Sequence, residues 1–505
     1  MTVLNQSVEG FRSISPAEFF YRNRQMAGFG NPTQSVYSAV RELVENSLDA
    51  CEDAQRIPQI RIAIDSQSSD ILSIEVADNG TGLPYQHVPE AFGRVLYGSK
   101  YDQKQKRGTF GLGVTMAILY GQITTDSPVV IHTQNSSGPG RAYSLLIDVE
   151  ENMPIIESER EQVRSNDGTT VTITLRGDLK RARERVAEYI RLTTIASPHA
   201  VVVLDFGGNE MIKVGGWSKR VPEVPIPSKP HPRAADLELL RRLMTKSPSK
   251  KLHDFLVDSF QQVGSRTASR FLKFLSLDSS VIIESLSRAD ISRLSTSLRR
   301  FDGFGRPDSK CLSPVGEEAF LLSVRSLFSP SWIQYSKQKP SEWQGNPFFV
   351  EGIIALGSKF PKADTPTLYR FTNKVPLLYD ANDDVMTKIM RRLNWKRYGF
   401  SGPLPVALFM HFGSTKVPYR AAGKQSLAHT IEIETAVTGL IRTLGRGLRK
   451  HAGHRDQSRR DARKMREFSE MFNLVAKYGP ALADAKPPSS TAHMVKTLFE
   501  VNTDV

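Results

Sequence analysis

Helix-like and strand-like hydrophobic patterns alternate along the first two hundred residues. Between residues 15 and 54, apolar side chains recur at helical spacing, with a break at 28–32 where glycines and a proline end one helix and begin another. Alternating apolar and polar positions predict strands at 59–65, 71–77, 129–133, 143–149, 170–175 and 201–205, and helical spacing returns at 111–120 and 178–194. This mixture predicts one α/β domain with a largely antiparallel sheet, which ends near residue 227.

A proline-dense stretch, residues 217–234, separates this domain from a small helical module. The module is rich in Lys and Arg, and its short helices are expected at 236–246, 250–260, 266–275 and 290–301. A second mixed domain follows, with strands at 347–357, 367–380 and 404–413 and a helix at 383–393. The pattern then becomes one long basic helix, or a broken pair, over 431–477, and a short amphipathic helix is expected at 491–501.

The composition of the chain indicates what kind of partner it binds and in which compartment it is found. The 505 residues are 39% hydrophobic and 24% charged, and no stretch approaches the roughly 20 apolar residues of a membrane span. The chain starts without an apolar leader, so we expect a cytoplasmic protein without membrane contact. The net charge of +14 favours nucleic acid as a partner, although a merely basic surface would give the same sum. Cys51 and Cys311 are expected to be reduced core thiols, with a single disulfide as the alternative.

One helix carries a polar stripe on an otherwise apolar surface. At about 100° per residue, Glu42, Asn46 and Asp49 fall within an arc of about 60°. The opposite, apolar side of the helix comprises Val40, Leu43, Val44 and Cys51. The stripe suits a ligand site, but an amphipathic surface helix with its polar face in water would give the same pattern.

Three glycine-bearing loops follow this helix. The first loop, 78–82, runs from Asp78 to Gly82 directly after a strand, and its glycines permit positive φ and close approach of a ligand. The second loop, 107–113 (RGTFGLG), precedes a helix, whose free N–H groups can bind phosphates. The third loop, 167–173, is a turn into a β-branched strand. Each loop alone could be an ordinary turn, and the second is not a Walker loop, but the helix and the three loops together and in this order form a specific pattern.

Taken in order, these motifs resemble those of the ATP-binding fold shared by gyrase, the Hsp90 chaperones, histidine kinases and MutL proteins. The motifs concerned are ELVENSLDA, DNGTG, RGTFGLG and DGTTV. A narrower resemblance, to the B subunits of DNA topoisomerase VI, rests on FFYRNRQMAGFGNP, LYGSK, RFTNKVPLLYD, NWKRYG and STKVPYRAAGK. This resemblance extends from about residue 15 to residue 430 and is weaker beyond.

The resemblance implies an α+β multidomain fold. Its expected parts are an N-terminal Bergerat-type ATPase α/β sandwich with a strap (1–228), a small helix-two-turn-helix insert (229–306), a ribosomal-S5-like transducer α/β domain with a long C-terminal stalk helix (307–470), and a segment that docks the A subunit (471–505).

The resemblance also implies a role for each residue of the site. Glu42 would activate the water that attacks the γ-phosphate of ATP, and Asn46 would hold Mg²⁺. Asp78 would accept a hydrogen bond from the adenine amino group. Lys416 would reach from the second mixed domain to the γ-phosphate, with a solvated loop lysine as the alternative and Lys424 as a rival. The further ATP-binding residues that it implies are Gly82, Ser99, Lys100, Gly108, Thr109, Phe110, Gly111, Leu112, Gly113 and Thr169.

Two places in the chain depart from the pattern of this family. Thr109 and Phe110 stand where two glutamines are expected, which changes the polar contacts of the lid over the phosphates. Glu45 stands where the family often has aspartate, a small change at the edge of the polar stripe. The glycines of the lid remain, and we therefore expect phosphate binding to be kept.

The resemblance finally implies an assembly of two kinds of subunit, A and B. ATP closes two B subunits into a homodimeric clamp, in which the N-terminal strap (about residues 4–30) crosses to the partner protomer. The A subunit supplies the cleaving tyrosine and its acidic metal site. The resulting A2B2 heterotetramer, nucleoid-associated in the cytoplasm, relaxes supercoils and decatenates double-stranded DNA without strong sequence specificity.

Three basic regions of the chain are candidates for contact with that DNA. They are the helix-two-turn-helix insert, the stretch 395–398 (WKRY) and the stretch 442–466. The alternatives for them are a helical spacer, a Trp and Tyr packed inward beside two surface bases, and a solvated helix face.

Other classes of protein share the ATP-binding motifs. A MutL-like nucleotide-gated DNA clamp without a cleavage partner is the main alternative. A chaperone clamp is disfavoured by the basic stalk and the helical insert. A histidine kinase needs a phospho-acceptor histidine in a helix before the ATP-binding domain, and none of the 10 histidines precedes His87. The sequence therefore predicts the ATPase subunit of a type IIB topoisomerase.

Overall fold

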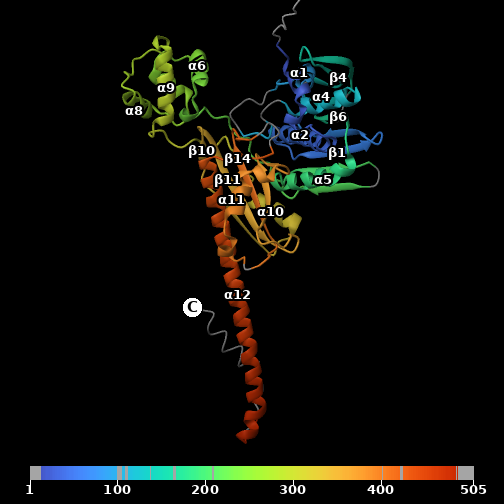
Figure 1. Cartoon of the computed structure of the whole chain (residues 1–505), viewed down its shortest axis with the longest axis vertical. Helices are drawn as coiled ribbons and strands as arrows, with labels where there is room; N and C mark the ends of the chain where they lie inside the picture. Colours follow the sequence, from blue (N-terminus) through green and yellow to red (C-terminus); the bar gives the residue numbers. More distant parts are fainter. Residues whose placement is uncertain are drawn as a thin grey trace, which may run out of the picture.

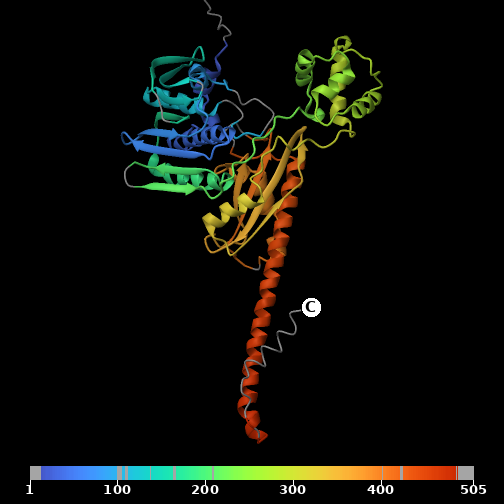
Figure 2. The same ribbon diagram turned by 180° about the vertical axis from the view of Figure 1, so that it is seen from behind.

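A computed structural model of the chain describes residues 13–98, 105–108, 112–136, 138–162, 166–207, 210–400, 402–420, 425–484 and 486. Figure 1 shows two mixed α/β units that lie against each other, a helical unit set apart from both, and a long helix that projects from the body. The view from behind gives the same separation (Figure 2). We name these parts the N-terminal unit (13–215), the helical unit (232–300), the C-terminal unit (317–414) and the stalk helix (431–482).

The N-terminal unit is built on one eight-stranded sheet. In pairing order its strands are β5 (Met153–Glu161), β4 (Gly138–Asp148), β3 (Val129–Asn135), β6 (Gly168–Arg176), β2 (Ile71–Ala77), β1 (Gln59–Ser66), β7 (Val201–Asp205) and β8 (Met211–Gly215). All neighbouring pairs are antiparallel except β1 and β7, which confirms the largely antiparallel sheet that the sequence predicts. Alternate residues of β1 and β2 are buried, so one face of the sheet carries the apolar side chains.

Helices pack against this apolar face. They are α1 (Pro16–Arg22), α2 (Pro32–Asp53), α3 (Val88–Gly93), α4 (Gly113–Thr125) and α5 (Leu179–Ala196), with the 3-10 turns η1 (Arg24–Ala27) and η2 (Tyr85–His87). α2 begins where the sequence predicts. The side chain of Asn31 accepts a hydrogen bond from the Gln34 N–H, and Pro32 occupies the first helical position, where a missing N–H costs nothing.

The helical unit has an apolar core of its own. Its helices are α6 (Leu237–Lys246), α7 (Leu252–Ser259), α8 (Ser265–Phe274) and α9 (Arg288–Arg300), with the turns η3 (Pro232–Ala234) and η4 (Ile283–Ser285). The buried core includes Phe255, Phe260, Phe271 and Leu298. α9 begins with a capping box, in which the side chains of Ser287 and Asp290 each bond the backbone N–H of the other residue. The helices expected over 236–301 are therefore confirmed.

A six-stranded sheet organises the C-terminal unit. Its strands are β9 (Trp332–Lys337), β10 (Ser341–Trp343), β11 (Asn346–Leu356), β12 (Thr367–Thr372), β13 (Val375–Pro376) and β14 (Val406–Ser414), paired in the order β10-β11-β14-β12-β13 with β9 on β11. The helices are α10 (Glu317–Phe328) and α11 (Val385–Arg392), with the turns η5 (Ala381–Asp383) and η6 (Trp395–Tyr398). Both faces of β11 are buried. Val350 and Ile354 share a core with the stalk helix, whereas Ile353 shares another with Phe320 of α10 and Ile195 of α5.

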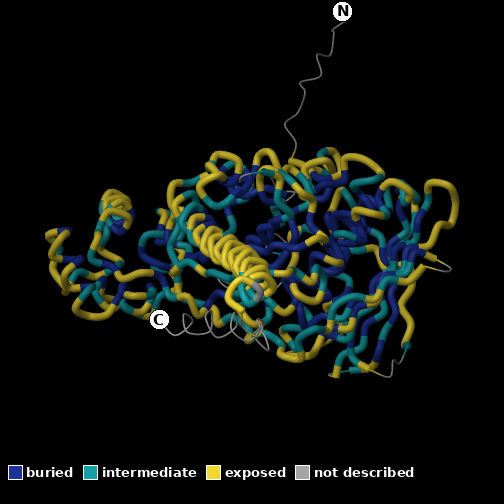
Figure 3. The backbone as a smooth tube through the Cα atoms, turned by 90° about the horizontal axis from the view of Figure 1, so that it is seen from below, coloured by how far each residue is buried: buried dark blue, intermediate teal, exposed yellow. Residues whose placement is uncertain are grey.

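The stalk helix, α12 (Ile431–Leu482), is 52 residues long. At 1.5 Å per residue this corresponds to roughly 80 Å. Its first part packs on the C-terminal unit through Val437, Leu440 and Leu444, which are fully buried. Beyond residue 452 the helix projects from the body (Figure 1), and Figure 3 shows that most of its residues there are exposed. Within the described ranges no helix has both the length and the apolar character needed to cross a membrane.

The structure adds helices and strands that the hydrophobic pattern does not predict, namely α3, α10, β5, β8, β9 and β10. β5 lies at the edge of its sheet, and nearly all of its residues are exposed, so the alternation typical of a half-buried strand is missing. The helix predicted over 431–477 is one unbroken helix that extends to Leu482. The helix expected at 491–501 lies outside the described residues.

Packing decides two alternatives that the sequence leaves open. In the stretch 395–398 the aromatic side chains pack inward: Trp395 is 3% exposed and its indole N–H donates to the Met390 carbonyl at 2.9 Å. The two bases of this stretch are exposed. Cys51 and Cys311 are buried free thiols, so the disulfide alternative is wrong.

The anchoring of α12 can be tested with two leucines of the same helix. Leu440→Ala removes a fully buried side chain, and we expect the free energy of unfolding of the C-terminal unit to fall by about 2–5 kcal/mol. Leu474→Ala, where the side chain is 58% exposed, is the matched control. It should change that free energy by less than about 0.5 kcal/mol. Chemical denaturation of the full chain measures both, and equal losses would contradict the anchoring.

Candidate functional site

A cavity of about 650 Å³ lies in the N-terminal unit between α2, the end of β2 and the start of α4. Its wall combines charged, polar and apolar side chains with glycines. The lining residues are Glu42, Leu43, Asn46, Ser47, Asp49, Ala50, Asp53, Val76, Asp78, Thr81, Gly82, Leu83, Pro84, His87, Ala91, Phe92, Tyr97, Gly98, Gly108, Leu112, Gly113, Val114, Thr115, Thr169 and Val171.

α2 forms one wall of this cavity with the polar stripe that the sequence indicates. Glu42 and Asp49 are 7% and 8% exposed, and Asn46 is exposed where it lines the cavity. The apolar residues of the helix lie in the core of the N-terminal unit. The alternative of a surface helix with its polar face in bulk water is therefore wrong, because Glu42 and Asp49 are buried and all three residues of the stripe line the cavity.

The carboxylate of Glu42 is held from two sides. Arg41, which is 3% exposed, forms an ion pair with Glu42 and another with Glu45 at 3.4 Å. On the other side lies Gly113, the first residue of α4, where an added Cβ would overlap the carboxylate. A larger residue at position 113 would therefore displace the Glu42 carboxylate, whose negative charge lies at the positive end of a helix dipole.

The carboxylate of Asp78 is oriented by three hydrogen bonds. One oxygen accepts from the N–H groups of Gly80 at 2.9 Å and Thr169 at 3.2 Å, and the other accepts from the Ser47 hydroxyl at 2.9 Å. The antiparallel pairing of β2 with β6 brings the third glycine loop beside the first. An ionised carboxylate only accepts hydrogen bonds, so it suits a ligand with an N–H donor, such as the amino group of a purine ring. The apolar residues around it are Val76, Leu83 and Val171.

The structure brings most of the predicted site residues together. Those that line the cavity are Glu42, Asn46, Asp78, Gly82, Gly108, Leu112, Gly113 and Thr169. Those that lie outside the described residues are Ser99, Lys100, Thr109, Phe110 and Gly111, together with the rival Lys424. Lys416 is exposed on the loop after β14 and does not line the cavity. Gly82 has a φ of +66°, and a Cβ there would collide with the Gln134 carbonyl, so this turn requires glycine.

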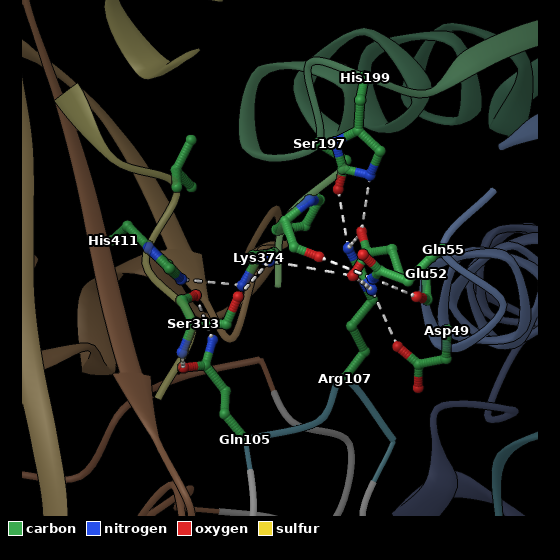
Figure 4. Close-up of polar contacts among 12 residues, drawn as sticks. Asp49, Glu52, Gln55, Gln105, Arg107, Ser197, His199, Ser313, Lys374 and His411 are labelled. Carbon is green, nitrogen blue, oxygen red and sulfur yellow. Dashed lines mark hydrogen bonds and ion pairs between the residues drawn. The ribbon is translucent and has the colours of Figure 1, made fainter. Parts of the chain in front are cut away.

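A buried guanidinium ties the start of the second glycine loop to α2 (Figure 4). Arg107 is 4% exposed. It donates to Asp49 at 2.9 Å, to Glu52 at 2.6 Å and to the hydroxyl of Ser197 at 2.8 Å. Glu52 also bonds the ring of His199 at 3.0 Å. The loop, the end of α2 and the segment after α5 are thus held by one cation.

Lys374 carries this network into the C-terminal unit (Figure 4). Its ammonium lies 3.9 Å from Glu52 and donates to the hydroxyl of Ser313 at 2.9 Å. Its backbone N–H donates to Nε2 of His411 at 2.9 Å, and Nδ1 of the same ring donates to Glu351 at 2.7 Å. The acceptor role of Nε2 requires that His411 is neutral, and burial lowers its pKa accordingly, although Glu351 acts in the opposite direction.

Glu52 is the charge that both buried cations share. Burial raises its pKa, but Arg107, Lys374 and the hydrogen bond from His199 outweigh burial, so the pKa lies well below the usual 4.5. Burial also lowers the pKa of Lys374, against the attraction of Glu52. Each of these charges is stable in the interior only while its partners are present.

The sequence gives only an indirect signal for this network. Arg107 opens the second glycine loop, and Lys374 stands in the family-like segment RFTNKVPLLYD. Neither position reveals a role, because the partners are distant in the chain: Arg107 and Glu52 are 55 residues apart.

Two family profiles match the chain. Residues 32–179 match the family described as "Histidine kinase-, DNA gyrase B-, and HSP90-like ATPase", and residues 307–464 match "Topoisomerase VI B subunit, transducer". All residues that line the cavity, including the polar stripe of α2, fall within the first match. The fold and the site therefore define an ATPase of the gyrase and Hsp90 class that is joined to a transducer.

Relatives extend this similarity over nearly the whole chain. Proteins named as the B subunit of type 2 DNA topoisomerase 6 are 37% identical over 483 residues in Saccharolobus islandicus and Saccharolobus solfataricus, and 36% identical over 482 residues in Saccharolobus shibatae. Each comparison covers 94% of this chain and 90% of the relative. A solved "N terminal domain of a DNA repair protein" has a TM-score of 0.43 and 14% identity over 87% of this chain and 99% of that chain, too distant to indicate more. The chain belongs to the family of type 2 DNA topoisomerase 6 B subunits and is the ATPase subunit of a type IIB topoisomerase.

The compensated charge of Glu52 predicts a specific acid sensitivity. Because its pKa is lower in the folded chain than in the unfolded chain, the ionised carboxylate stabilises the fold above about pH 4.5, and this contribution is lost as the pH falls through the folded pKa. Glu52→Gln leaves Arg107 and Lys374 without this negative partner, so the free energy of unfolding should fall by about 3–5 kcal/mol at pH 7. The difference in thermal midpoint between wild type and variant should narrow below pH 4.5.

Thermal scans of both proteins between pH 3 and pH 8 measure this difference. Glu184→Gln, at an exposed position of α5, is the control and should change stability by less than about 0.5 kcal/mol. A difference between wild type and Glu52→Gln that stays constant with pH would contradict the charged state assigned to Glu52.

Proposed function

We propose that the cavity binds ATP and that Glu42 promotes its hydrolysis, with Mg²⁺ held by Asn46 and the phosphates. The observation that carries this proposal is the convergence of Glu42, Asn46 and Asp78 on one cavity together with Gly113 at the start of a helix. Nucleotide hydrolysis needs three parts: an acceptor for the amino group of the base, a helix N-terminus that binds phosphates, and a general base held in place.

The adenine ring would lie at Asp78 and the phosphates at the start of α4. Asp78 accepts from the adenine amino group, with Gly82 and Thr169 beside it. Gly108, Leu112 and Gly113 border the phosphate end of the cavity, where the N–H groups of α4 favour negative charge. The remaining predicted contacts belong to the same proposal and come from Ser99, Lys100, Thr109, Phe110 and Gly111.

Mg²⁺ fits this site as an ion that is carried with the nucleotide. Such an ion is held by one or two protein oxygens together with phosphate oxygens. Among the described residues no group of three or more His, Cys, Asp or Glu is arranged to hold a metal by itself. Asn46 lines the cavity one helical turn from Glu42, so its amide oxygen would hold the ion beside the reacting phosphate. When bound, the ion offsets the charge of the phosphates.

Glu42 would act as the general base. Its carboxylate is buried between Arg41 and Gly113, which orients it for a water at the γ-phosphate. Lys416 would bring a compensating positive charge to the same phosphate. Because Lys416 is exposed and outside the cavity wall, hydrolysis would require a change of conformation that carries its loop to the nucleotide.

The proposal extends to partners and to the division into domains. The chain would pair with an A subunit that cleaves DNA, and two copies would close on ATP, so that one duplex passes through another. The stretch 442–466 of α12 holds ten Lys/Arg against two Asp, and from residue 453 onward it is exposed, which suits contact with a phosphate backbone. The domains would be 1–228, 229–306, 307–470 and 471–505, with the last docking the A subunit.

Two isosteric variants test the roles of the carboxylates. Glu42→Gln keeps the shape of the side chain but removes the base, so ATP turnover should fall by about 10²–10⁴-fold. The affinity for a non-hydrolysable ATP analogue should change by less than about 3-fold. Asp78→Asn removes a charged acceptor, and that affinity should fall by about 10-fold or more. Steady-state hydrolysis and analogue binding by the full chain give both numbers, and full turnover in Glu42→Gln would refute the proposal.

A second experiment separates a topoisomerase subunit from a MutL-like clamp. The full chain is mixed with the tyrosine-bearing A subunit of the same organism, and complex formation is followed by pull-down. We expect a stable complex that relaxes supercoiled plasmid only with ATP and that loses this activity with Glu42→Gln. A chain that hydrolyses ATP on DNA but binds no such subunit would favour the clamp.

A further inference from the structure

Asn373 occupies an unusual position between the two mixed units. It follows β12 in the tight turn to β13, and its φ of +46° lies in the left-handed region. Asparagine and glycine adopt this region far more readily than other residues. The side chain is 2% exposed, so each of its polar atoms needs a partner inside the protein.

The amide of Asn373 finds its partners in both units at once. Nδ2 donates one hydrogen bond to the Lys106 carbonyl at 2.9 Å and another to the Ser414 carbonyl at 3.0 Å. Oδ1 accepts from the Ser414 N–H at 2.9 Å. The backbone N–H of Asn373 donates to the Phe412 carbonyl at 2.8 Å, which fixes the turn against β14. Both protons of the amide are therefore used, one for each unit.

The two residues that the Asn373 side chain bonds, Lys106 and Ser414, lie next to the two parts of the proposed site, the cavity and the Lys416 loop. Lys106 lies in the segment 105–108, which reaches the cavity wall at Gly108. Ser414 ends β14 and begins the turn that bears Lys416, whose N–H donates to the Ser414 hydroxyl at 3.2 Å. One amide thus joins the rim of the cavity to the base of the lysine loop.

The surrounding contacts keep the rim segment in place for this bridge. Gln105 exchanges two hydrogen bonds with Ser313, accepting from its N–H at 2.7 Å and donating to its carbonyl at 3.1 Å. Arg107, on the other side of Lys106, is fixed by the carboxylates of α2. The Lys106 carbonyl is therefore presented to Asn373 by a segment that is held on both sides.

We propose that Asn373 is a positioning residue for ATP hydrolysis, which sets the place of the Lys416 loop relative to the nucleotide cavity. This inference rests on the proposed function, because it assigns Asn373 an effect only through Lys416. Asn373 itself touches neither the cavity nor the nucleotide site, so it should influence the rate of the chemical step and leave nucleotide binding unchanged.

The left-handed backbone determines which substitutions test this role. Asn373→Gly removes the amide and keeps the backbone conformation, whereas alanine would add strain at a φ of +46°. Asn373→Asp keeps the shape and the acceptor for the Ser414 N–H, but it places a carboxylate against the carbonyl oxygens of Lys106 and Ser414. The two variants break the bridge in different ways and should agree in their effect.

The test is a double-mutant cycle with Lys416→Ala in the full chain. We expect Asn373→Gly and Asn373→Asp each to lower kcat for ATP by about 10-fold or more. The Kd of a non-hydrolysable ATP analogue should change by less than about 3-fold, which also shows that the variants are folded. In the Lys416→Ala background the same substitutions should change kcat by less than about 2-fold, because the residue through which they act is gone.

Asn152 provides a matched control in the N-terminal unit. It is likewise buried, has a φ of +55°, and its amide exchanges hydrogen bonds with the backbone of Val95 at 2.9 and 3.1 Å. Any effect of Asn152→Gly on kcat should be the same factor with or without Lys416.

The possible failures are distinguishable. If Asn373→Gly lowers kcat by the same factor in both backgrounds, Asn373 does not act through Lys416 and the inference is wrong. Unchanged kcat in Asn373→Gly and Asn373→Asp has the same consequence. If instead Lys416→Ala alone keeps full kcat, the role proposed for Lys416 fails, and the inference fails with it.

Discussion

The arrangement of this protein depends on the pairing of one buried cation. The guanidinium of Arg107 is nearly inaccessible to water, and an unpaired charge in that position would cost several kcal/mol. Its partners Asp49, Glu52 and Ser197 stand at the end of α2 and just after α5. Satisfying this charge therefore holds three separate parts of the chain in one arrangement. Since residues of α2 and of the second glycine loop also form the wall of the cavity, the shape of that cavity follows from the same contacts.

Two kinds of contact join the N-terminal and C-terminal units. The end of α5 packs with Phe320 of α10 in a close-packed apolar core, which does not respond to the charge of a ligand. Beside it, Glu52 meets Lys374 and Lys106 meets Asn373 through polar contacts that weaken steeply when their geometry changes. A displacement of the cavity rim would therefore disturb these polar contacts before the apolar core. The apolar core between α5 and α10 keeps its packing. The sheet of the C-terminal unit, to which Asn373 belongs, also packs against the stalk helix.

The sequence predicted what depends on neighbours in the chain. α2 was predictable because its cap, its proline and its apolar spacing all lie within a few turns, and the stripe from Glu42 to Asp49 follows from the same periodicity. β5 was missed because an exposed edge strand has no alternation to detect. The partners of Arg107 and of Lys374 were missed because the fold, rather than any local pattern, brings them together. The distance of Lys416 from the cavity has the same origin, since it is set by the packing of two units.

The C-terminal unit offers two lysines to the proposed reaction, and their surroundings separate their roles. Lys374 is 5% exposed, lies near Glu52 and donates to Ser313. If Lys374 moved toward a phosphate, the buried Glu52 carboxylate would lose one of its two positively charged partners. A charge held in this way supports the junction in every state of the nucleotide. Lys416 is exposed, so it leaves no buried partner behind when its loop moves. A cation that must reach the γ-phosphate only when ATP is present has to be free of buried partners. This favours Lys416 over Lys374 for that role.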